Sequence, residues 1–429
     1  MKKMKKMKKK CLVMITAIAM SLSLLLGGCT NHNGETSSES SSESMPASQS
    51  SEQSKSSEGT EGSSEVETKT VDTTTPEPSK EPFVCDRSAA FELLSNITIG
   101  WNLGNTLDAH GAGPSPVSEM YWGNPKTTQE MIDAVATQGF NAIRIPVTYA
   151  EHVGKAPDYT IAEPWLNRVQ EVVDYAMNAG MYVFLDTHHE PDYWLIPNED
   201  HEEKATNELI AIWKQVAERF RDYDEHLIFE GMNEPRTKGS PSEWNGGEPS
   251  ERKIVEKMNQ AFIDTVRATG GNNETRLLVI CTYGNNAGYN VAKEFTIPED
   301  NYIAVAVHMY TPYYFTYAGE GGQFFDTWDG SHKGDISATL KQLNNYFIKK
   351  DLPVVVTEFG AVNKGKPEEV INWAKDYISV MNNYGIKCFW WDNGCYQTNG
   401  ENFGIFDRRN LTWYDQKLAD TLVEAATTQ

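Results

Sequence analysis

The chain has 429 residues and a formal net charge of −22, because 60 acidic side chains outnumber 38 basic ones. This charge argues against nucleic acid as a partner, since phosphate binding needs a basic surface. The composition changes twice along the chain and divides it into residues 1–28, 29–82 and 83–429.

Residues 1–28 are predicted to be an export signal. Seven lysines lie in the first ten residues, and an apolar run of 16 residues follows at 11–26. This order is typical of a signal peptide, and the run is too short for an ordinary membrane-spanning helix. The four residues that end at Cys29 (Leu-Gly-Gly-Cys) resemble the lipobox of bacterial lipoproteins, which implies cleavage before Cys29 and its lipidation. The alternative is an ordinary secretory signal cleaved near the two glycines.

Residues 29–82 are predicted to be a disordered linker. The 53 residues after Cys29 include 15 serines and no aromatic residue. Such a segment cannot bury enough apolar surface to offset its ordering entropy. We therefore expect a tether that holds the following domain at the bacterial cell surface or in the extracellular space. The alternative interpretation of this segment is a glycosylated or partner-binding stalk.

Residues 83–429 are predicted to form one folded domain, since all eleven tryptophans lie there. Eight apolar, β-rich runs alternate with segments of helical periodicity. The runs lie at 97–104, 141–147, 181–188, 227–233, 277–283, 302–309, 353–359 and 387–392. The helical segments lie at 128–139, 164–180, 202–221, 251–269, 335–349, 367–384 and 414–426, with a weak one at 286–298.

Continuous apolar strands that alternate with helices imply a parallel sheet covered by helices. Eight such units predict an α/β fold of the (β/α)8 TIM-barrel type. The rival is an open doubly wound sheet, which would show a glycine-rich phosphate loop after its first strand. The first run lacks that spacing and contains Trp101.

Polar residues mark the ends of these runs. In such barrels the carboxyl ends of the strands share one rim, where active sites lie. Charges are rare inside strands unless they are paired. The convergence of these polar residues on one rim therefore predicts an active-site ring. Its members include Asn105, Arg144, His188, His189, Asn233, Glu234, His308, Tyr310, Glu358 and Trp391.

Two carboxylates in this ring, Glu234 and Glu358, fit glycoside hydrolysis, which needs an acid for the leaving oxygen and a carboxylate at the anomeric carbon. Either glutamate alone could be a capping or salt-bridged residue. His188 and His189 are adjacent and would point opposite ways on a strand, so we expect no shared metal. None of the domain's four cysteines has C-x-x-C spacing. No metal or organic cofactor is expected.

Five segments carry a family resemblance. The domain resembles glycoside hydrolase family 5, the cellulase-like family of retaining (β/α)8 hydrolases, over residues 85–428. The WGNP segment is most like the endoglucanases and xyloglucanases of subfamily 4. The segments are 100–109 (GWNLGNTLDA), 122–128 (WGNPKTT), 141–147 (NAIRIPV), 229–235 (FEGMNEP) and 355–360 (VVTEFG).

The resemblance implies that Glu234 is the general acid/base and Glu358 the nucleophile. Asn105, at the end of the first run, is also expected to bind substrate. Around the pair the resemblance implies hydrogen bonds to Glu358 from Arg144 and Tyr310, a 2-hydroxyl contact from Asn233, sugar contacts from His188 and His189, support of the acid/base by His308, and an aromatic floor from Trp391.

The chemistry of the pair predicts its electrostatics and spacing. Arg144 should keep Glu358 ionised, whereas burial and the second carboxylate should raise the pKa of Glu234. A retaining mechanism predicts carboxyl groups about 5–5.5 Å apart. Aromatic residues in the loops could stack on further sugars in an open cleft, with ordinary loop packing as the alternative; they are Trp122, Tyr193, Trp194, Trp244, Tyr314 and Trp328.

We therefore expect a monomeric, surface-tethered, retaining endo-β-1,4-glucanase that acts on cellulose, mixed-linkage glucan or xyloglucan. It would reach the membrane only through Cys29, and we expect no carbohydrate-binding domain. A β-mannanase or xylanase could use the same catalytic pair, and a transglycosylase would share the covalent intermediate. From another class, a noncatalytic glycan-binding lipoprotein would need neither Glu234 nor Glu358.

Overall fold

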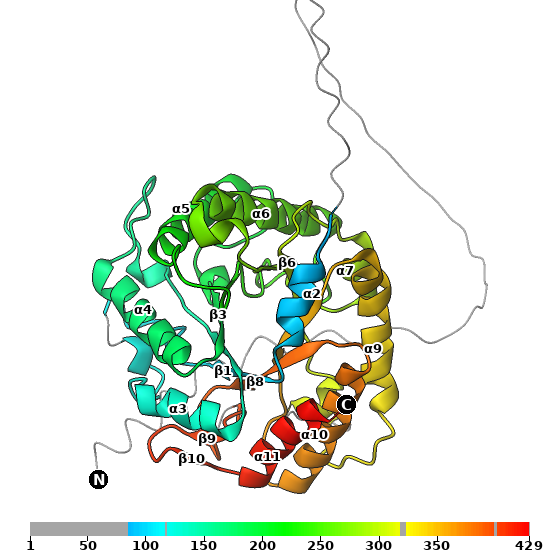
Figure 1. Cartoon of the computed structure of the whole chain (residues 1–429). Coiled ribbons are helices and arrows are strands. Elements are labelled where there is room, and N and C mark those ends of the chain that lie inside the picture. Colours follow the sequence, from blue (N-terminus) through cyan, green and yellow to red (C-terminus); the bar gives the residue numbers. More distant parts are fainter. Residues whose placement is uncertain (1–84, 116–117, 318–322, 399–400, 429) are drawn as a thin grey trace, which may run out of the picture. The chain divides into compact units, whose positions relative to one another are not determined.

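Eight parallel strands close into a barrel in the computed structural model, which describes residues 85–115, 118–317, 323–398 and 401–428 (Figure 1). Strand β1 pairs with both β2 and β8, so the sheet has no open edge and the (β/α)8 prediction is confirmed. The strands are β1 (Gly100–Leu103), β2 (Ala142–Ile145), β3 (Tyr182–Asp186), β4 (Leu227–Glu230), β5 (Leu278–Asn286), β6 (Ile303–His308), β7 (Val354–Phe359) and β8 (Lys387–Asp392).

Helices follow the strands and surround the barrel. Each predicted helical segment contains a helix, and the weak one holds only a short helix. They are α3 (Gln129–Gln138), α4 (Glu163–Asn178), α5 (Glu202–Arg219), α6 (Pro249–Ala268), α7 (Tyr289–Glu294), α9 (Lys333–Tyr346), α10 (Pro367–Asn382) and α11 (Gln416–Thr427). Two short helices, α2 (Ser88–Ser95) and α8 (Tyr313–Thr316), and a small hairpin of β9 (Phe406–Asp407) and β10 (Thr412–Trp413) were not predicted.

Local chemistry sets several helix ends. The side chain of Asp415 accepts a hydrogen bond from the Leu418 N–H at 3.1 Å, which satisfies a free donor at the start of α11. Glu248 and Glu251 form a capping box at the start of α6. Gly139 ends α3 with a φ of 114°, a left-handed conformation that glycine adopts without strain.

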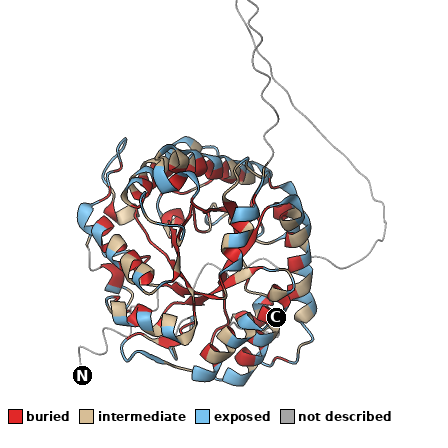
Figure 2. Cartoon of the chain, viewed as in Figure 1, coloured by how far each residue is buried: buried red, intermediate tan, exposed pale blue. Residues whose placement is uncertain are grey.

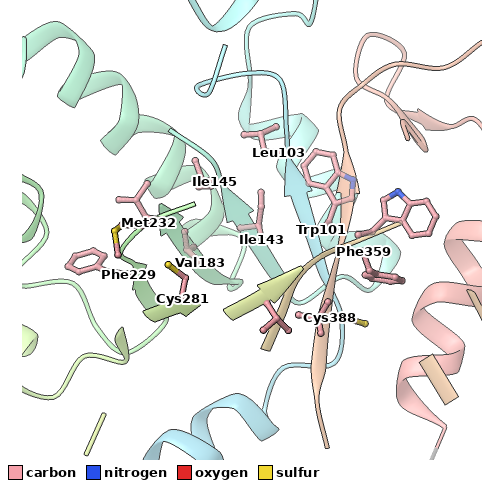
Figure 3. Packing of buried hydrophobic residues seen from close by; sticks show 14 of the residues in the cluster. Trp101, Leu103, Ile143, Ile145, Val183, Phe229, Met232, Cys281, Phe359 and Cys388 are labelled. Atoms are coloured by element: carbon pink, nitrogen blue, oxygen red, sulfur yellow. The ribbon is translucent and has the colours of Figure 1, made fainter. Parts of the chain in front are cut away.

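The main apolar core lies between the strands and the surrounding helices. Trp101 and Leu103 of β1 and Ile143 and Ile145 of β2 belong to it, and Figure 3 shows them beside further core residues. The helices turn their buried sides toward the barrel and their exposed sides outward (Figure 2). This layer buries the apolar runs from which the strands were predicted.

A second apolar cluster fills the amino-terminal end of the barrel. Ala90 and Leu94 of α2 pack there against strand side chains such as Phe184 and Phe389. Helix α2 lies across the ring of strands in Figure 1 and covers this end. The apolar plug leaves the opposite end, where the strands terminate, for polar side chains.

Among the described cysteines, Cys281 and Cys388 are buried and form no disulfide. Among the described helices, none combines the length and apolarity needed to cross a membrane. The predicted signal peptide (1–28), the lipidated Cys29 and the linker (29–82) lie outside the described residues.

Candidate active site

The ten predicted site residues form a connected group at the carboxyl end of the barrel. Hydrogen bonds, ion pairs and ring contacts link Arg144, Asn233, Glu234, His308, Tyr310, Glu358, His188, Trp391, His189 and Asn105, the last through Asp108. Because parallel strands end on one side of a barrel, residues far apart in sequence meet there.

Arg144 of β2 is the centre of the group and is fully buried. Its guanidinium donates to Glu358 Oε1 at 2.7 Å and to Asn233 Oδ1 at 2.8 Å. It also donates to Glu230 Oε2 at 2.6 Å and lies 2.7 Å from Asp186 Oδ2. A buried charge needs such partners, because desolvation would otherwise cost several kcal/mol. The surrounding carboxylates fix the guanidinium in one orientation.

Glu358, at the end of β7, accepts hydrogen bonds on both carboxylate oxygens. Arg144 donates to Oε1, and the Tyr310 hydroxyl donates to Oε2 at 2.9 Å. Burial and the charge of Glu358 raise the pKa of Tyr310, so this hydroxyl keeps its proton and remains a donor. The side chain of Glu358 is therefore held in place and stabilised as an anion.

Glu234 follows β4 in a left-handed backbone conformation with a φ of 46°. Its N–H donates to Asn285 Oδ1 at 2.7 Å, which helps to hold this uncommon conformation. Its Oε1 lies 2.9 Å from His308 Nδ1, and its Oε2 lies 3.2 Å from a guanidinium nitrogen of Arg236. Two cationic or proton-bearing groups thus face one carboxylate.

The pKa of Glu234 differs from the prediction. Burial disfavours its ionised form, but the hydrogen bond from His308 and the charge of Arg236 outweigh burial and lower the pKa to about 2. Burial lowers the pKa of His308, yet Glu358 and Glu234 reverse this and raise it. The expectation of a raised pKa for Glu234 is therefore wrong, and these opposite shifts favour the proton on His308. The prediction omitted the cations on either side of Glu234.

The two glutamates lie close together. A carboxylate oxygen of Glu234, a carboxylate oxygen of Glu358 and a nitrogen of His308 all lie within 4.8 Å of one another. His308 Nδ1 is 3.5 Å from Glu358 Oε2 as well as 2.9 Å from Glu234 Oε1. This proximity fits the close carboxyl pair of a retaining glycosidase.

His188 and Trp391 form one wall of the site. Their rings stack with centroids 5.5 Å apart and planes 7° apart. Burial lowers the pKa of His188 to about 3, and the charge of Arg144 acts in the same direction. His188 is therefore neutral, and its Nδ1 lies 3.1 Å from Asp186 Oδ2. Gly104 lets the Trp391 ring approach, because a Cβ there would lie 2.8 Å from Trp391 Cη2.

Asn105 and His189 lie at the edge of the group. Asn105 has a φ of 57°, and its N–H donates to Asp108 Oδ2 at 3.0 Å. His189 Nε2 is 3.4 Å from the same oxygen. Both residues are partly exposed, so their side chains can reach a ligand.

Three residues that support the pair were not predicted: Arg236 and Asn285, which contact Glu234, and Glu230, which holds Arg144. Glu230 had a signal in the sequence, since it is an acidic residue within the apolar strand Leu-Ile-Phe-Glu and such a charge needs a buried partner. Asn285 lies beyond a register shift in β5, so its approach to Glu234 could not be predicted from strand periodicity.

The loop aromatics divide into two groups. Trp194 and Trp328 are buried in the main core, so the prediction that they form sugar subsites is wrong; ordinary packing accounts for them. Trp244 lies under the Arg236 guanidinium at 4.3 Å. Trp122 and Tyr193 contact the imidazole of His110 beside the site.

Comparison with known proteins agrees with this geometry. The family described as cellulase (glycosyl hydrolase family 5) matches residues 107–397. Endoglucanase A of Ruminococcus albus is 52% identical over 79% of this chain and 93% of its own length. Endoglucanase B of Neocallimastix patriciarum is 43% identical over 78% of this chain and 71% of its own length.

Solved structures give the same result. A GH5 xyloglucan-specific endo-β-1,4-glucanase from a metagenomic library, in complex with cellotriose, is 55% identical with a TM-score of 0.78, over 79% of this chain and 99% of that one. A GH5-4 broad-specificity endoglucanase from Ruminococcus champanellensis is 44% identical with a TM-score of 0.75, over 78% of this chain and 98% of that one. The chain described here belongs to glycoside hydrolase family 5, the cellulase family.

Proposed function

We propose that this protein is a retaining endo-β-1,4-glucanase in which Glu358 is the nucleophile and Glu234 the general acid/base. The observation that carries this proposal is the close pair itself, with oxygens within 4.8 Å and different partners on each carboxylate. Arg144 and Tyr310 favour an anion at Glu358, whereas His308 brings a proton to Glu234. The two glutamates are thus equipped for different steps of one reaction.

In the first step Glu358 attacks the anomeric carbon while Glu234 protonates the leaving oxygen, which breaks the glycosidic bond and forms a covalent glycosyl-enzyme. We infer that His308 supplies the required proton from Nδ1, which lies 2.9 Å from Glu234 Oε1. Its transfer along this hydrogen bond turns Glu234 into the acid. The pair therefore shares the proton and titrates as a unit.

In the second step Glu234 removes a proton from water, which attacks the same carbon and releases Glu358. Arg144 occupies Asn233 Oδ1, and the Asn233 amide nitrogen donates one hydrogen bond to the His188 carbonyl oxygen at 3.4 Å. Its second N–H can donate to the sugar 2-hydroxyl. The neutral His188 and the stacked Trp391 present an acceptor and an apolar face to the same sugar. These contacts can hold the ring over Glu358.

We propose β-1,4-linked glucans as the substrate class, with cellulose, mixed-linkage glucan and xyloglucan as candidates. Support comes from the relatives: one similar structure is named a xyloglucan-specific enzyme with cellotriose bound, and another is named a lichenase from Caldicellulosiruptor, 39% identical. The partly exposed Trp122 and Tyr193 offer stacking faces beyond the central sugar.

The test is product analysis by mass spectrometry on xyloglucan, mixed-linkage glucan, carboxymethyl-cellulose, mannan and xylan. We expect early release of mixed oligosaccharides from a glucan, and none from the Glu358→Gln variant. Cleavage of mannan or xylan alone would replace the proposed substrate and keep the catalytic pair. Binding without cleavage by the wild type would favour the glycan-capture protein instead.

We also propose that the protein works as a monomer anchored at the bacterial cell surface through a lipid on Cys29. Support comes from the basic and apolar segments before the Leu-Gly-Gly-Cys sequence and from the serine-rich linker after it. Wild-type protein should partition into the detergent phase of Triton X-114, and Cys29→Ser should remain in the aqueous phase with the mass of one chain in light scattering. Equal partitioning of the two would contradict the anchor.

A further inference from the structure

A second cluster of ligating side chains lies beside the catalytic pair. One ligand atom each of His110, His189 and Asp192 lies within 4.8 Å of the others. His110 Nε2 and Asp192 Oδ2 are 3.3 Å apart. The Nε2 atoms of both histidines are buried, and each faces a carboxylate oxygen: Asp192 Oδ2 for His110 and, at 3.4 Å, Asp108 Oδ2 for His189.

The tautomer of His110 follows from its neighbours. Its Nδ1 lies 2.9 Å from the Tyr193 hydroxyl, which in turn donates to Glu151 Oε1 at 3.0 Å. The N–H groups of Gly111 and Gly113 donate to Glu151 Oε2, as expected for an ionised carboxylate. The Tyr193 hydroxyl has a single proton, which it donates in the hydrogen bond to the Glu151 carboxylate. His110 must therefore donate from Nδ1 to Tyr193.

His110 Nε2 faces a carboxylate oxygen of Asp192 at 3.3 Å. A metal ion bound by both atoms would take the place of any proton on this nitrogen. Two tetrahedral zinc ligands at about 2.0–2.1 Å from the metal lie about 3.3 Å apart, which is the separation seen here.

We propose that His110, His189 and Asp192 form a binding site for a divalent transition-metal ion such as Zn²⁺ at the edge of the glucan site. Two imidazole nitrogens and one carboxylate are a donor set that zinc accepts, with its fourth position open to water. His189 closes the site by a turn of its ring toward the other two ligands.

The surroundings fit such a site. The Glu151–Tyr193–His110 chain has the form of the outer hydrogen bonds that orient metal-binding histidines. Lys238 pairs with Asp192 Oδ1, which leaves Oδ2 for the metal. The side chains of His110 and His189 are 16% and 22% exposed, so an ion can enter from solvent.

The site differs from the Glu234–His308–Glu358 triad and is not needed for hydrolysis. His189 is expected to contact sugar when the metal is absent. An ion that captures its ring would therefore compete with glucan and act as a reversible inhibitor. Zinc binding itself does not depend on the proposed function, whereas the competition with glucan rests on it.

Isothermal titration of the full chain, without a histidine tag, with zinc chloride tests the site directly. We expect one zinc per chain in the wild type. His110→Ala should weaken binding by more than about a hundredfold, and Tyr193→Phe by about tenfold, because it removes only the group that orients His110. Asp192→Asn provides a second ligand variant if His110→Ala does not fold.

Two controls separate this site from other clusters. His226→Ala removes an exposed histidine that lies 3.2 Å from Asp224 and should leave zinc binding unchanged. Glu358→Gln disrupts the catalytic triad and should also leave it unchanged. Absence of binding in the wild type, unchanged binding in both ligand variants, or loss of binding with Glu358→Gln would overturn the proposal.

Discussion

At the scale of single residues, the two glutamates differ in the cations beside them. The guanidinium of Arg144 forms ion pairs with Glu358, Glu230 and Asp186, and each carboxylate has an oxygen within 2.7 Å of a guanidinium nitrogen. Arg236 contacts Glu234 and is itself held by Glu243 Oε1 at 3.2 Å. Because Arg236 touches Glu234 without reaching the bond to be cleaved, we regard it as a positioning residue for the acid/base.

Arg236→Gln should move the alkaline limb of the kcat/KM profile to higher pH by about one unit. The guanidinium favours loss of the proton shared by Glu234 and His308, so its removal raises the pKa of that pair. Glu358, Glu401, His188 and Arg144 also face the pair and are unchanged in the variant.

Arg219→Gln is the matched control, since this arginine pairs with Glu163 on the outer helices and should leave the profile in place. The measurement is kcat/KM on a chromogenic cello-oligosaccharide from pH 4 to 10. An alkaline limb that stays at the wild-type pH in Arg236→Gln would show that Arg236 does not act on the acid/base.

Site residues that end apolar runs could be predicted, because a charge such as Arg144 or Glu358 in that context needs a polar partner. The identity of the polar partner depends on which strands become neighbours in the folded barrel. Arg236 contacts Glu234 from the loop after β4, and Asn285 does so from the irregular end of β5, and no sequence periodicity describes either path. Because these two contacts were not predicted, the direction of the pKa shift at Glu234 was predicted wrongly.

At the scale of elements, the barrel strands could be predicted because each is buried on both faces and reads as a continuous apolar run. Helix α2 could not. It has only eight residues and no side-chain cap, and its buried residues Ala90 and Leu94 meet the open amino-terminal end of a barrel that exists only in three dimensions. Short helices of this kind are defined by the gap they fill.

Gly100→Ala tests the packing of that end. A Cβ at Gly100 would lie 2.0 Å from Cδ1 of Phe389, a ring inside the barrel, so the methyl group forces the core apart. We expect a loss of about 1–3 kcal/mol in the free energy of unfolding, measured by urea denaturation.

Gly334→Ala is the control, since a Cβ there meets nothing within 4 Å and the residue lies in α9. It should leave stability unchanged or raise it by up to about 1 kcal/mol. Equal stability of Gly100→Ala and the wild type would show that the barrel end is loosely packed.

At the scale of the whole molecule, the domain buries several carboxyl groups outside the catalytic pair. Burial raises the pKa of Glu190 to about 8 and of Glu208 to about 7. Burial also raises the pKa of Asp186 to about 6, although Arg144 opposes the shift. The folded state therefore holds protons that the unfolded chain releases.

The contribution of these three carboxyl groups to stability should accordingly fall as pH rises. A carboxyl group with a raised folded pKa contributes its full stabilisation below the unfolded pKa, near 4.5, and loses it as pH rises through the folded value. For Glu190 this window ends near pH 8. Urea denaturation should show a smaller pH 5 to pH 8 difference in Glu190→Gln than in the wild type, by an amount on the order of 3 kcal/mol.

The matched control is Glu203→Gln, an exposed glutamate on α5 that should keep the wild-type pH dependence. The glutamine at position 190 retains an oxygen that can accept the Tyr149 N–H, which Glu190 Oε1 accepts at 2.6 Å. An unchanged pH dependence in Glu190→Gln would mean that Glu190 is ionised in the folded protein.

The most direct measurement of the central claim is the identity of the residue that becomes glycosylated. A 2-deoxy-2-fluoro-β-cellobioside with a dinitrophenolate leaving group slows both steps, and its reactive leaving group lets the intermediate accumulate. Peptide mass spectrometry should then find one sugar ester on Glu358 in the wild type and none in Glu358→Gln. A label on Glu234 or elsewhere, or no label together with products of inverted anomeric configuration, would contradict the double displacement at Glu358.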